Sequence, residues 1–179
     1  MENREEKALI LDFLPNGYPM EPRRSPIAQA MGLNHFTLLE LVPRKGAQLQ
    51  LREEVYIGEG KREKVEFIRG RLPKQKLTET AKLQLKDLIG NLVDLREEQF
   101  VEFFNSAGAV STRLHQLELL PGLGKKHTQA IIEEREKEKF KSFEDIKQRV
   151  KNVPDPKKII EKRLMEELIE EVRHRLFVA

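Results

Sequence analysis

The run Leu119–Lys126 has the residue types and spacing of a turn that could bind phosphate. Gly122 and Gly124 permit backbone angles that other residues avoid and let a ligand approach the main chain, and Pro121 presets the turn. The amides of such a turn lie beside the free N–H groups that begin the next helix, where the helix dipole favours an anion. The pair Lys125-Lys126 opposes that dipole, at a cost of up to about 1 kcal/mol for each lysine. A bound phosphate would explain both lysines, whereas a glycine-rich turn with solvated lysines is the structural alternative.

The turn and the first residues of the following helix form one set of predicted nucleic-acid contacts. Backbone amides and lysine ammonium groups suit phosphate oxygens, which every nucleic acid presents. The predicted contact residues are Gly122, Leu123, Gly124, Lys125, Lys126 and Thr128.

Nothing in the sequence has the pattern of a catalytic or metal site. There is no cysteine, and the histidines at positions 35, 115, 127 and 174 show no metal-ligand spacing. Asp145 follows the turn at the distance at which DNA glycosylases with a similar turn place a catalytic aspartate. However, Ser142 stands three residues before Asp145, so the pair is typical of a helix cap. We therefore expect no enzymatic activity, no cofactor and no metal.

Charge is unevenly distributed along the 179 residues. Residues 1–76 contain 14 Lys and Arg against 11 Asp and Glu, whereas residues 77–179 contain 19 of each kind. No apolar run approaches the roughly 20 residues of a membrane span, and the N-terminus does not have the pattern of a signal peptide. The sequence predicts a cytoplasmic protein with no membrane partner, whose basic excess lies in the N-terminal part.

Short runs rich in β-forming residues alternate with turn residues before Pro73. The predicted strands include Ala8–Leu14, His35–Val42, Glu54–Ile57 and Lys64–Leu72. A basic segment with four or five short strands favours a small β-barrel of the oligonucleotide-binding (OB) type, although other small barrels would give the same pattern. We assign residues 1–76 to this domain.

Basic and aromatic side chains of the predicted barrel are candidates for binding a nucleic-acid strand. The basic candidates are Arg44, Lys45, Lys61, Arg62, Lys64, Arg69 and Arg71. His35 and Tyr56 have polar atoms and suit a stacking role and core packing equally. Core packing is favoured for Phe36 and Phe67, because small barrels need large interior residues.

Helical periodicity begins after Leu77 and indicates an all-α domain over residues 77–179. Thr78 can cap a first helix, whose apolar face would consist of Ala81, Leu85, Leu88, Ile89 and Leu92. The further predicted helices are Glu97–Ala107, Ser111–Leu119, Lys125–Lys139, Ser142–Val150 and a long helix from Lys157 or Lys158 through Leu176.

The segment from Leu114 to about Glu167 resembles the tandem helix-hairpin-helix domains of bacterial DNA-uptake and excision-repair proteins. The matching pieces are Leu120–Gly124, Ala130–Glu136 and Phe140–Ile146. The resemblance implies a first hairpin at residues 120–126 and a degenerate second hairpin at residues 152–158. The second has no glycine, its two prolines offer no N–H, and Asp155 places a carboxylate where a phosphate would lie. We expect the second hairpin to be mainly structural.

Four segments match a pattern that extends over nearly the whole chain: Phe36–Leu41, Val55–Gly58, Phe103–Asn105 and Thr112–Gly122. In these segments the sequence resembles the archaeal domain-of-unknown-function family 655. The resemblance implies an OB-like barrel joined to a helical hairpin domain, with nucleic-acid binding as the expected activity. The predicted fold class is α+β, with a small OB-like β-barrel followed by an all-α tandem helix-hairpin-helix domain.

These observations predict a non-enzymatic nucleic-acid-binding protein that contacts phosphate backbone through the first hairpin and a strand through the barrel. RNA is favoured over DNA, because single-strand binding is the usual function of such a barrel. The alternatives are a DNA-binding accessory in repair or replication, and a protein-interaction module in a translation or repair assembly. The salt dependence of binding separates nucleic-acid binding from protein interaction, because phosphate binding weakens steeply with salt.

Overall fold

The computed structural model describes residues 4–179, which divide into two compact units. The first, named here the sheet unit, comprises the residues up to Asp87 together with Glu167–Ala179. The second, named here the helical unit, comprises Leu88–Glu166. The C-terminal residues therefore belong to the same unit as the strands.

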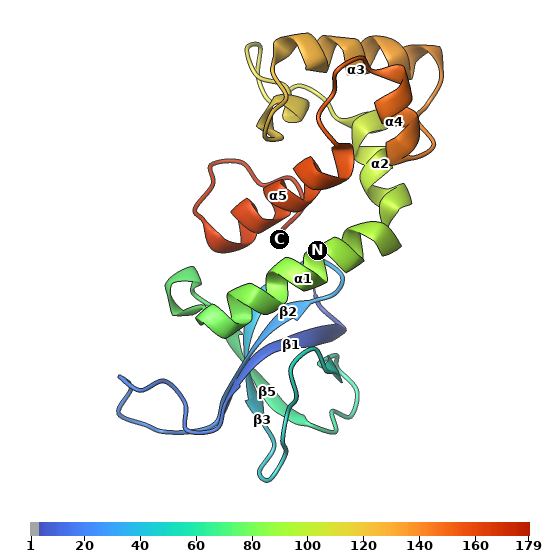
Figure 1. Ribbon diagram of the computed structural model, residues 1–179. Coiled ribbons are helices and arrows are strands. Elements are labelled where there is room, and N and C mark those ends of the chain that lie inside the picture. The colour runs from blue at the N-terminus through green and yellow to red at the C-terminus, as the bar shows by residue number, and fades with distance from the viewer. Residues whose placement is uncertain (1–3) are drawn as a thin grey trace. The chain divides into compact units, whose positions relative to one another are not determined.

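The sheet unit contains one antiparallel sheet with the strand order β4-β1-β2-β3-β5. Strands β1, β2, β3 and β5 are labelled in Figure 1. The strands are β1 (Lys7–Leu14), β2 (Ile27–Gly32), β3 (Leu38–Pro43), β4 (Glu54–Tyr56) and β5 (Val65–Arg71). β4 and β5 form the two edges, and no ladder joins them within residues 4–179. The sheet is open, so the predicted small OB-like β-barrel is wrong, although the α+β class is correct.

Of the two edge strands, β4 is short and β5 is irregular. β4 has only three residues, and the segment after it combines Gly58 and Gly60 with charged residues, all of which are poor strand formers. β5 is irregular, because its register against β3 shifts twice and Gly70 has a φ of +150°. Such bulges bend a strand away from regular pairing.

Strand β2 was not predicted, although it lies at the centre of the sheet between β1 and β3. All six of its residues are buried. Its sequence is Ile-Ala-Gln-Ala-Met-Gly, in which Ile27 is the one strong β-former. Local propensity therefore gives no signal here, and the strand forms because it is paired on both sides.

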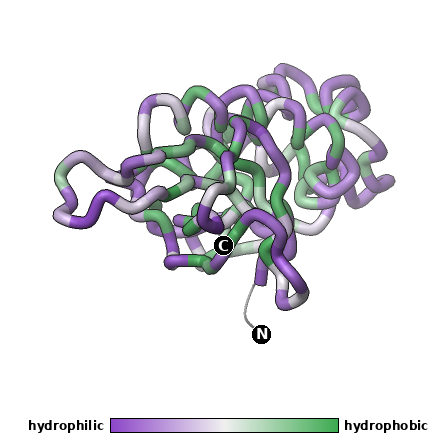
Figure 2. Tube along the Cα trace, turned by 90° about the horizontal axis from the view of Figure 1, so that it is seen from below, coloured by the Kyte–Doolittle hydropathy of each residue, from purple (hydrophilic) through white to green (hydrophobic). Residues whose placement is uncertain are grey.

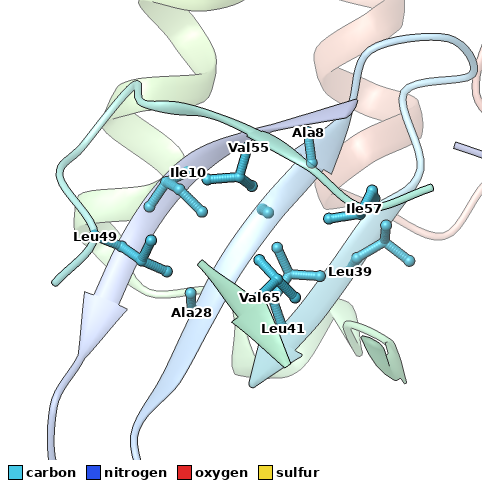
Figure 3. Packing of buried hydrophobic residues seen from close by; sticks show 10 residues of the cluster. Ala8, Ile10, Ala28, Leu39, Leu41, Leu49, Val55, Ile57 and Val65 are labelled. Atoms are coloured by element: carbon cyan, nitrogen blue, oxygen red, sulfur yellow. The ribbon is translucent and has the colours of Figure 1, made fainter. Parts of the chain in front are cut away.

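The inner face of the sheet is lined by a cluster of small and branched apolar residues (Figure 3). The cluster comprises Ala8, Ile10, Ala28, Ala30, Leu39, Leu41, Leu49, Val55, Ile57 and Val65, with Phe13 and Ile68 packed against it. Along the trace, hydrophobic stretches alternate with hydrophilic ones, as expected for elements with one buried face (Figure 2).

Helices follow the strands in the order η1 (Lys74–Lys76), α1 (Glu79–Leu95), α2 (Glu97–Ser106), η2 (Gln116–Leu119), α3 (Lys125–Lys137), α4 (Phe143–Arg149) and α5 (Pro156–Ile169). The predicted cap of α1 is confirmed, because the Thr78 hydroxyl accepts a hydrogen bond from Ala81 N–H at 3.1 Å. The predicted apolar face of α1 is also buried. None of the described helices is long and apolar enough to cross a bilayer.

The predicted helix Ser111–Leu119 is reduced to the four-residue 3-10 helix η2. The preceding residues form a tight turn instead, in which Ala109 pairs with His115 and the amides of Val110 and Ser111 both donate to Leu114 O. A helix-hairpin-helix needs an α-helix on both sides of its turn. The predicted tandem helix-hairpin-helix domain is therefore wrong.

The last predicted helix is shorter than expected, because α5 ends at Ile169 rather than near Leu176. The buried Glu167 explains the course of the chain beyond it. One oxygen of its carboxylate accepts hydrogen bonds from the amides of Leu176, Phe177 and Val178 at 2.9–3.1 Å. These amides cannot also form helical hydrogen bonds.

Candidate nucleic-acid interface

The α3 turn (residues 120–126) presents exposed glycines directly before α3. Gly122 has a φ of +86°, a conformation that favours glycine, and Gly124 is the N-cap residue of the helix. The side chain of Leu123 is buried between them, and its N–H donates to Leu120 O at 3.2 Å. The buried leucine anchors the turn, and both glycines face solvent.

No side chain caps the N-terminus of α3. Gly124 has none to offer, and the first helical turn contains no acidic residue. The first amides of a helix have no intrahelical partner and concentrate the positive end of its dipole. Lys126 is exposed in this first turn and forms no ion pair with any residue of the described chain. These groups together favour an anion at the start of α3.

Lys125 differs from Lys126 because it is attached to the segment before the turn. Its ammonium group lies 3.0 Å from Arg113 O and 3.2 Å from a carboxylate oxygen of Glu118. The other oxygen of Glu118 accepts the N–H of His115 at 2.7 Å. The His115 amide, followed by Lys125, holds the pKa of Glu118 below its usual range. Lys125 thus stabilises the turn in addition to contributing charge.

Like Leu123, Thr128 is a predicted contact of this group whose side chain does not reach the surface. Its side chain is buried, and its hydroxyl has no hydrogen-bond partner among the described residues. The structure therefore brings the exposed glycines and lysines together and leaves Thr128 beneath them.

The α5 turn (residues 152–158) packs against the α3 turn. A methyl group added to Gly122 would lie 3.4 Å from Cγ of Pro154. Asp155 accepts the amide of Lys157 at 3.1 Å, and the Lys157 ammonium group pairs with Asp94 at 2.8 Å, which raises the pKa of Lys157. Asp155 and Lys157 therefore have partners within the helical unit, whereas Lys158 is exposed and forms no ion pair within the described residues.

The predicted basic residues of the sheet unit do not share one face. Arg62 and Arg71 line one cavity, Lys61 and Lys64 line a second with Tyr56, and Arg69 lines a third with Phe67. In β5, Gly70 pairs with Glu40 and Ile68 pairs with Leu41, so the register shifts at Arg69, which has no partner in β3. Arg69 and Arg71 therefore diverge. Bulges re-aim side chains in this way.

Several of these cations have partners in the sheet unit. Lys64 pairs with Glu53, whose pKa it lowers, and Arg69 lies 3.4 Å from Glu21. Arg44 donates to Arg62 O at 2.7 Å. Lys45 and Lys61 are exposed and form no ion pair within residues 4–179.

The aromatic residues considered for stacking differ in exposure and in contacts. Phe36 is 1% exposed, as expected for a core residue, whereas Phe67 is 49% exposed, so its predicted core packing is wrong. The hydroxyl of Tyr56 accepts the amide of Gly60 at 2.9 Å. His35 is half-buried, and its carbonyl accepts the amide of Ala179 at 3.0 Å.

Asp145 has structural contacts that match the predicted helix cap. Its amide donates to Ser142 Oγ at 2.9 Å, and its carboxylate accepts the Lys141 amide and pairs with Arg149 at 3.2 Å. The Lys141 amide, followed by Arg149, lowers the pKa of Asp145. Across residues 4–179, no group of three or more His, Cys, Asp or Glu side chains could hold a metal ion.

Sequence reasoning did not anticipate the capping box before the turn. His115 Nδ1 accepts the amide of Leu117 at 3.1 Å while Glu118 accepts the amide of His115. The spacing of His115 and Glu118 was a usable signal, since a capping box pairs the N-cap residue with an acid three positions later. The capping box was not predicted because histidine is an unusual N-cap residue.

Known proteins are similar to this chain over almost its entire length. The chain is 41% identical over 174 residues to uncharacterized protein MJ0038 of Methanocaldococcus jannaschii, covering 97% of this chain and 79% of the relative. It is 46% identical to Af1531 of Archaeoglobus fulgidus, whose crystal structure matches 98% of this chain and all of that one with a TM-score of 0.82. The family model described as "Protein of unknown function (DUF655)" matches residues 4–179, and the chain therefore belongs to the DUF655 family.

Proposed function

We propose that this protein is a non-enzymatic nucleic-acid-binding protein that contacts phosphate backbone at the α3 turn, with RNA favoured over DNA. The observation that supports this most directly is the uncapped N-terminus of α3. An N-terminus without an acidic residue or a side-chain cap, and with Lys126 exposed in its first turn, suits an anionic ligand.

The matched test compares two lysines that occupy similar helix starts. Lys126 and Lys158 are both exposed near the beginning of a helix, and neither forms an ion pair within the described chain. Lys126→Glu and Lys158→Glu therefore change the net charge equally. Lys126 lies at an uncapped helix start, whereas α5 begins behind the Asp155 carboxylate.

Lys126→Glu is expected to weaken binding to an unstructured RNA oligomer by about tenfold or more, equivalent to ~1.4 kcal/mol. The slope of log affinity against log salt should fall by about one, as for one lost phosphate contact. Lys158→Glu should have a clearly smaller effect. Fluorescence anisotropy with the full chain, from low to physiological salt, measures both quantities.

The double variants extend the comparison to the paired lysines. Lys125→Glu with Lys126→Glu should weaken binding more than Lys157→Glu with Lys158→Glu. Circular dichroism must first show that each variant is folded, because Lys125 and Lys157 both form ion pairs. Equal losses from the two helix starts would contradict the assignment of binding to the α3 turn.

The nucleic-acid class is tested by the same titrations with RNA and DNA oligomers of equal length. Tighter RNA binding supports the preference, and equal affinities overturn it. If the folded chain binds neither oligomer at low salt, the proposal fails and a protein-interaction role replaces it.

A further inference from the structure

The inner face of the open sheet has a cavity of about 510 Å³ between its two edge strands. Ile57 and Gly58 directly follow β4, and Ile68 and Arg71 belong to β5 on the other side. Leu39 of β3 completes an apolar floor, and Figure 3 shows Leu39 and Ile57 at one end of the core cluster. The cavity exists because β4 and β5 do not pair.

Two guanidinium groups of this cavity retain unused hydrogen-bond donors. Arg62 donates from Nε to Gly58 O at 2.8 Å, and Arg71 donates from Nη1 to Ala179 O at 3.0 Å. Neither arginine pairs with an Asp or Glu side chain of residues 4–179. A guanidinium group has five N–H donors in a fork that matches phosphate, so each can bind an anion while it keeps its present contact.

Two of the three glutamates that line the cavity already have partners within the protein. Glu5 accepts the amides of Asn34, His35 and Thr37, and Glu59 pairs with Arg4. Glu6 is exposed and has no ion pair in the part of the chain that the structure describes. Its carboxylate can accept hydrogen bonds from an amino group of a ligand.

We infer that this cavity binds one nucleoside monophosphate unit, with the base over Leu39, Ile57 and Ile68 and the phosphate on Arg62 and Arg71. The volume lies within the range of about 300–1,000 Å³ typical of small-ligand sites, and an apolar floor with a few directed polar groups is the usual composition of such sites. Glu6 would accept the amino group of adenine, cytosine or guanine, which uracil lacks.

The unit can come from a free mononucleotide or from one residue of a bound strand. In the second case the inference rests on the proposed function and adds a base-binding position to it. Isothermal titration calorimetry of the full chain with AMP, CMP, GMP and UMP tests the first source. Anisotropy titration with single-stranded RNA oligomers tests the second.

The sharpest control lies on the same strand. Arg69 is two positions from Arg71 but lines a different cavity, so Arg71→Gln and Arg69→Gln change the charge equally at separate places. Arg71→Gln and Arg62→Gln are each expected to weaken binding of AMP by about tenfold, as for a lost charge-assisted phosphate contact. Arg69→Gln should leave AMP binding unchanged, and UMP should bind more weakly than AMP.

The outcomes separate this inference from the function of the α3 turn. Binding of AMP by the Lys126→Glu variant with unchanged affinity supports a separate site in the sheet unit. The inference is overturned if no mononucleotide binds at millimolar concentration and the oligomer affinities of the Arg71→Gln and Arg69→Gln variants are equal. In that case, a loss of oligomer binding by Lys126→Glu would still support the α3 turn.

Discussion

At the residue scale, Gly122 and Gly124 have different conformational requirements although they stand two positions apart. Gly122 has a φ of +86° and lies against Pro154, whereas Gly124 has a φ of −101° and open space where a side chain would be. The sequence motif presents the two glycines as equivalent. Only Gly122 needs the left-handed region.

Gly122→Ala is expected to lower the free energy of unfolding by about 1–2 kcal/mol, because a side chain is strained in this region. Gly124→Ala should cost clearly less, mainly through the loss of a favoured N-cap residue. Urea unfolding followed by circular dichroism measures both. Equal costs would show that the strain at Gly122 is relieved by the turn.

Also at the residue scale, His115 makes the stability of the fold depend on pH. Burial, together with the nearby Arg135 charge, lowers the pKa of His115 below its usual 6.5. The unfolded chain therefore binds a proton at a higher pH than the folded chain does, so folding loses stability as pH falls below about 6.5. Protonation also removes the Nδ1 acceptor that caps η2.

His115→Asn keeps a capping acceptor and does not titrate, so it should flatten the decline in melting temperature between pH 7 and 5. The comparison is a series of thermal melts of both proteins at matched ionic strength. Parallel declines would mean that His115 does not cause the pH dependence.

At the scale of the elements, Gln29 connects the central strand β2 to the start of the helices. Its amide group donates to Tyr18 Oη at 3.1 Å and to Lys76 O at 2.7 Å, and its carbonyl accepts the Thr78 amide at 3.0 Å. Tyr18 in turn donates to Glu40 at 2.8 Å, and burial raises the pKa of Tyr18 to about 12. This buried polar network fixes β2 relative to η1 and the cap of α1.

Gln29→Met preserves the approximate shape of the side chain but removes the side-chain partner of Lys76 O and of the Thr78 amide, and one of the two partners of the Tyr18 hydroxyl. The free energy of unfolding should fall by at least about 2 kcal/mol. Gln75→Met, at an exposed position, is the control and should change it by less than about 0.5 kcal/mol. Urea unfolding distinguishes them, and similar values for the two variants would show that the network contributes little.

At the scale of the whole molecule, a buried carboxylate brings the C-terminal residues back to the sheet unit. Glu167 accepts three amides from residues 176–178, and the amide of Ala179 reaches His35 O at 3.0 Å. Arg71 then donates to Ala179 O. The C-terminal segment thereby adjoins one of the arginines of the proposed nucleotide cavity.

Glu167→Gln replaces a charged acceptor by a neutral one and should lower the free energy of unfolding by about 2 kcal/mol. Amide hydrogen exchange at residues 176–178 should accelerate. Glu171→Gln, at an exposed position, is the matched control. Unchanged exchange in the Glu167 variant would show that other contacts hold the segment.

The sequence by itself determined the features that depend on neighbouring residues. The cap and buried face of α1, the Ser142–Asp145 cap, four of the five strands and the glycine turn before α3 all arise from local periodicity, propensity and turn chemistry. The family was also recognisable from four short segments.

Only the tertiary structure decided the features that depend on distant partners. β2 has weak strand propensity and forms because β1 and β3 pair with it. The predicted helix does not extend through Leu176, where Glu167 binds the amides of residues 176–178. The failure of β4 and β5 to pair left the sheet open, and the bulge in β5 sent Arg69 and Arg71 to different cavities. Pairing, register and burial are set by contacts far apart in the chain, which local patterns do not encode.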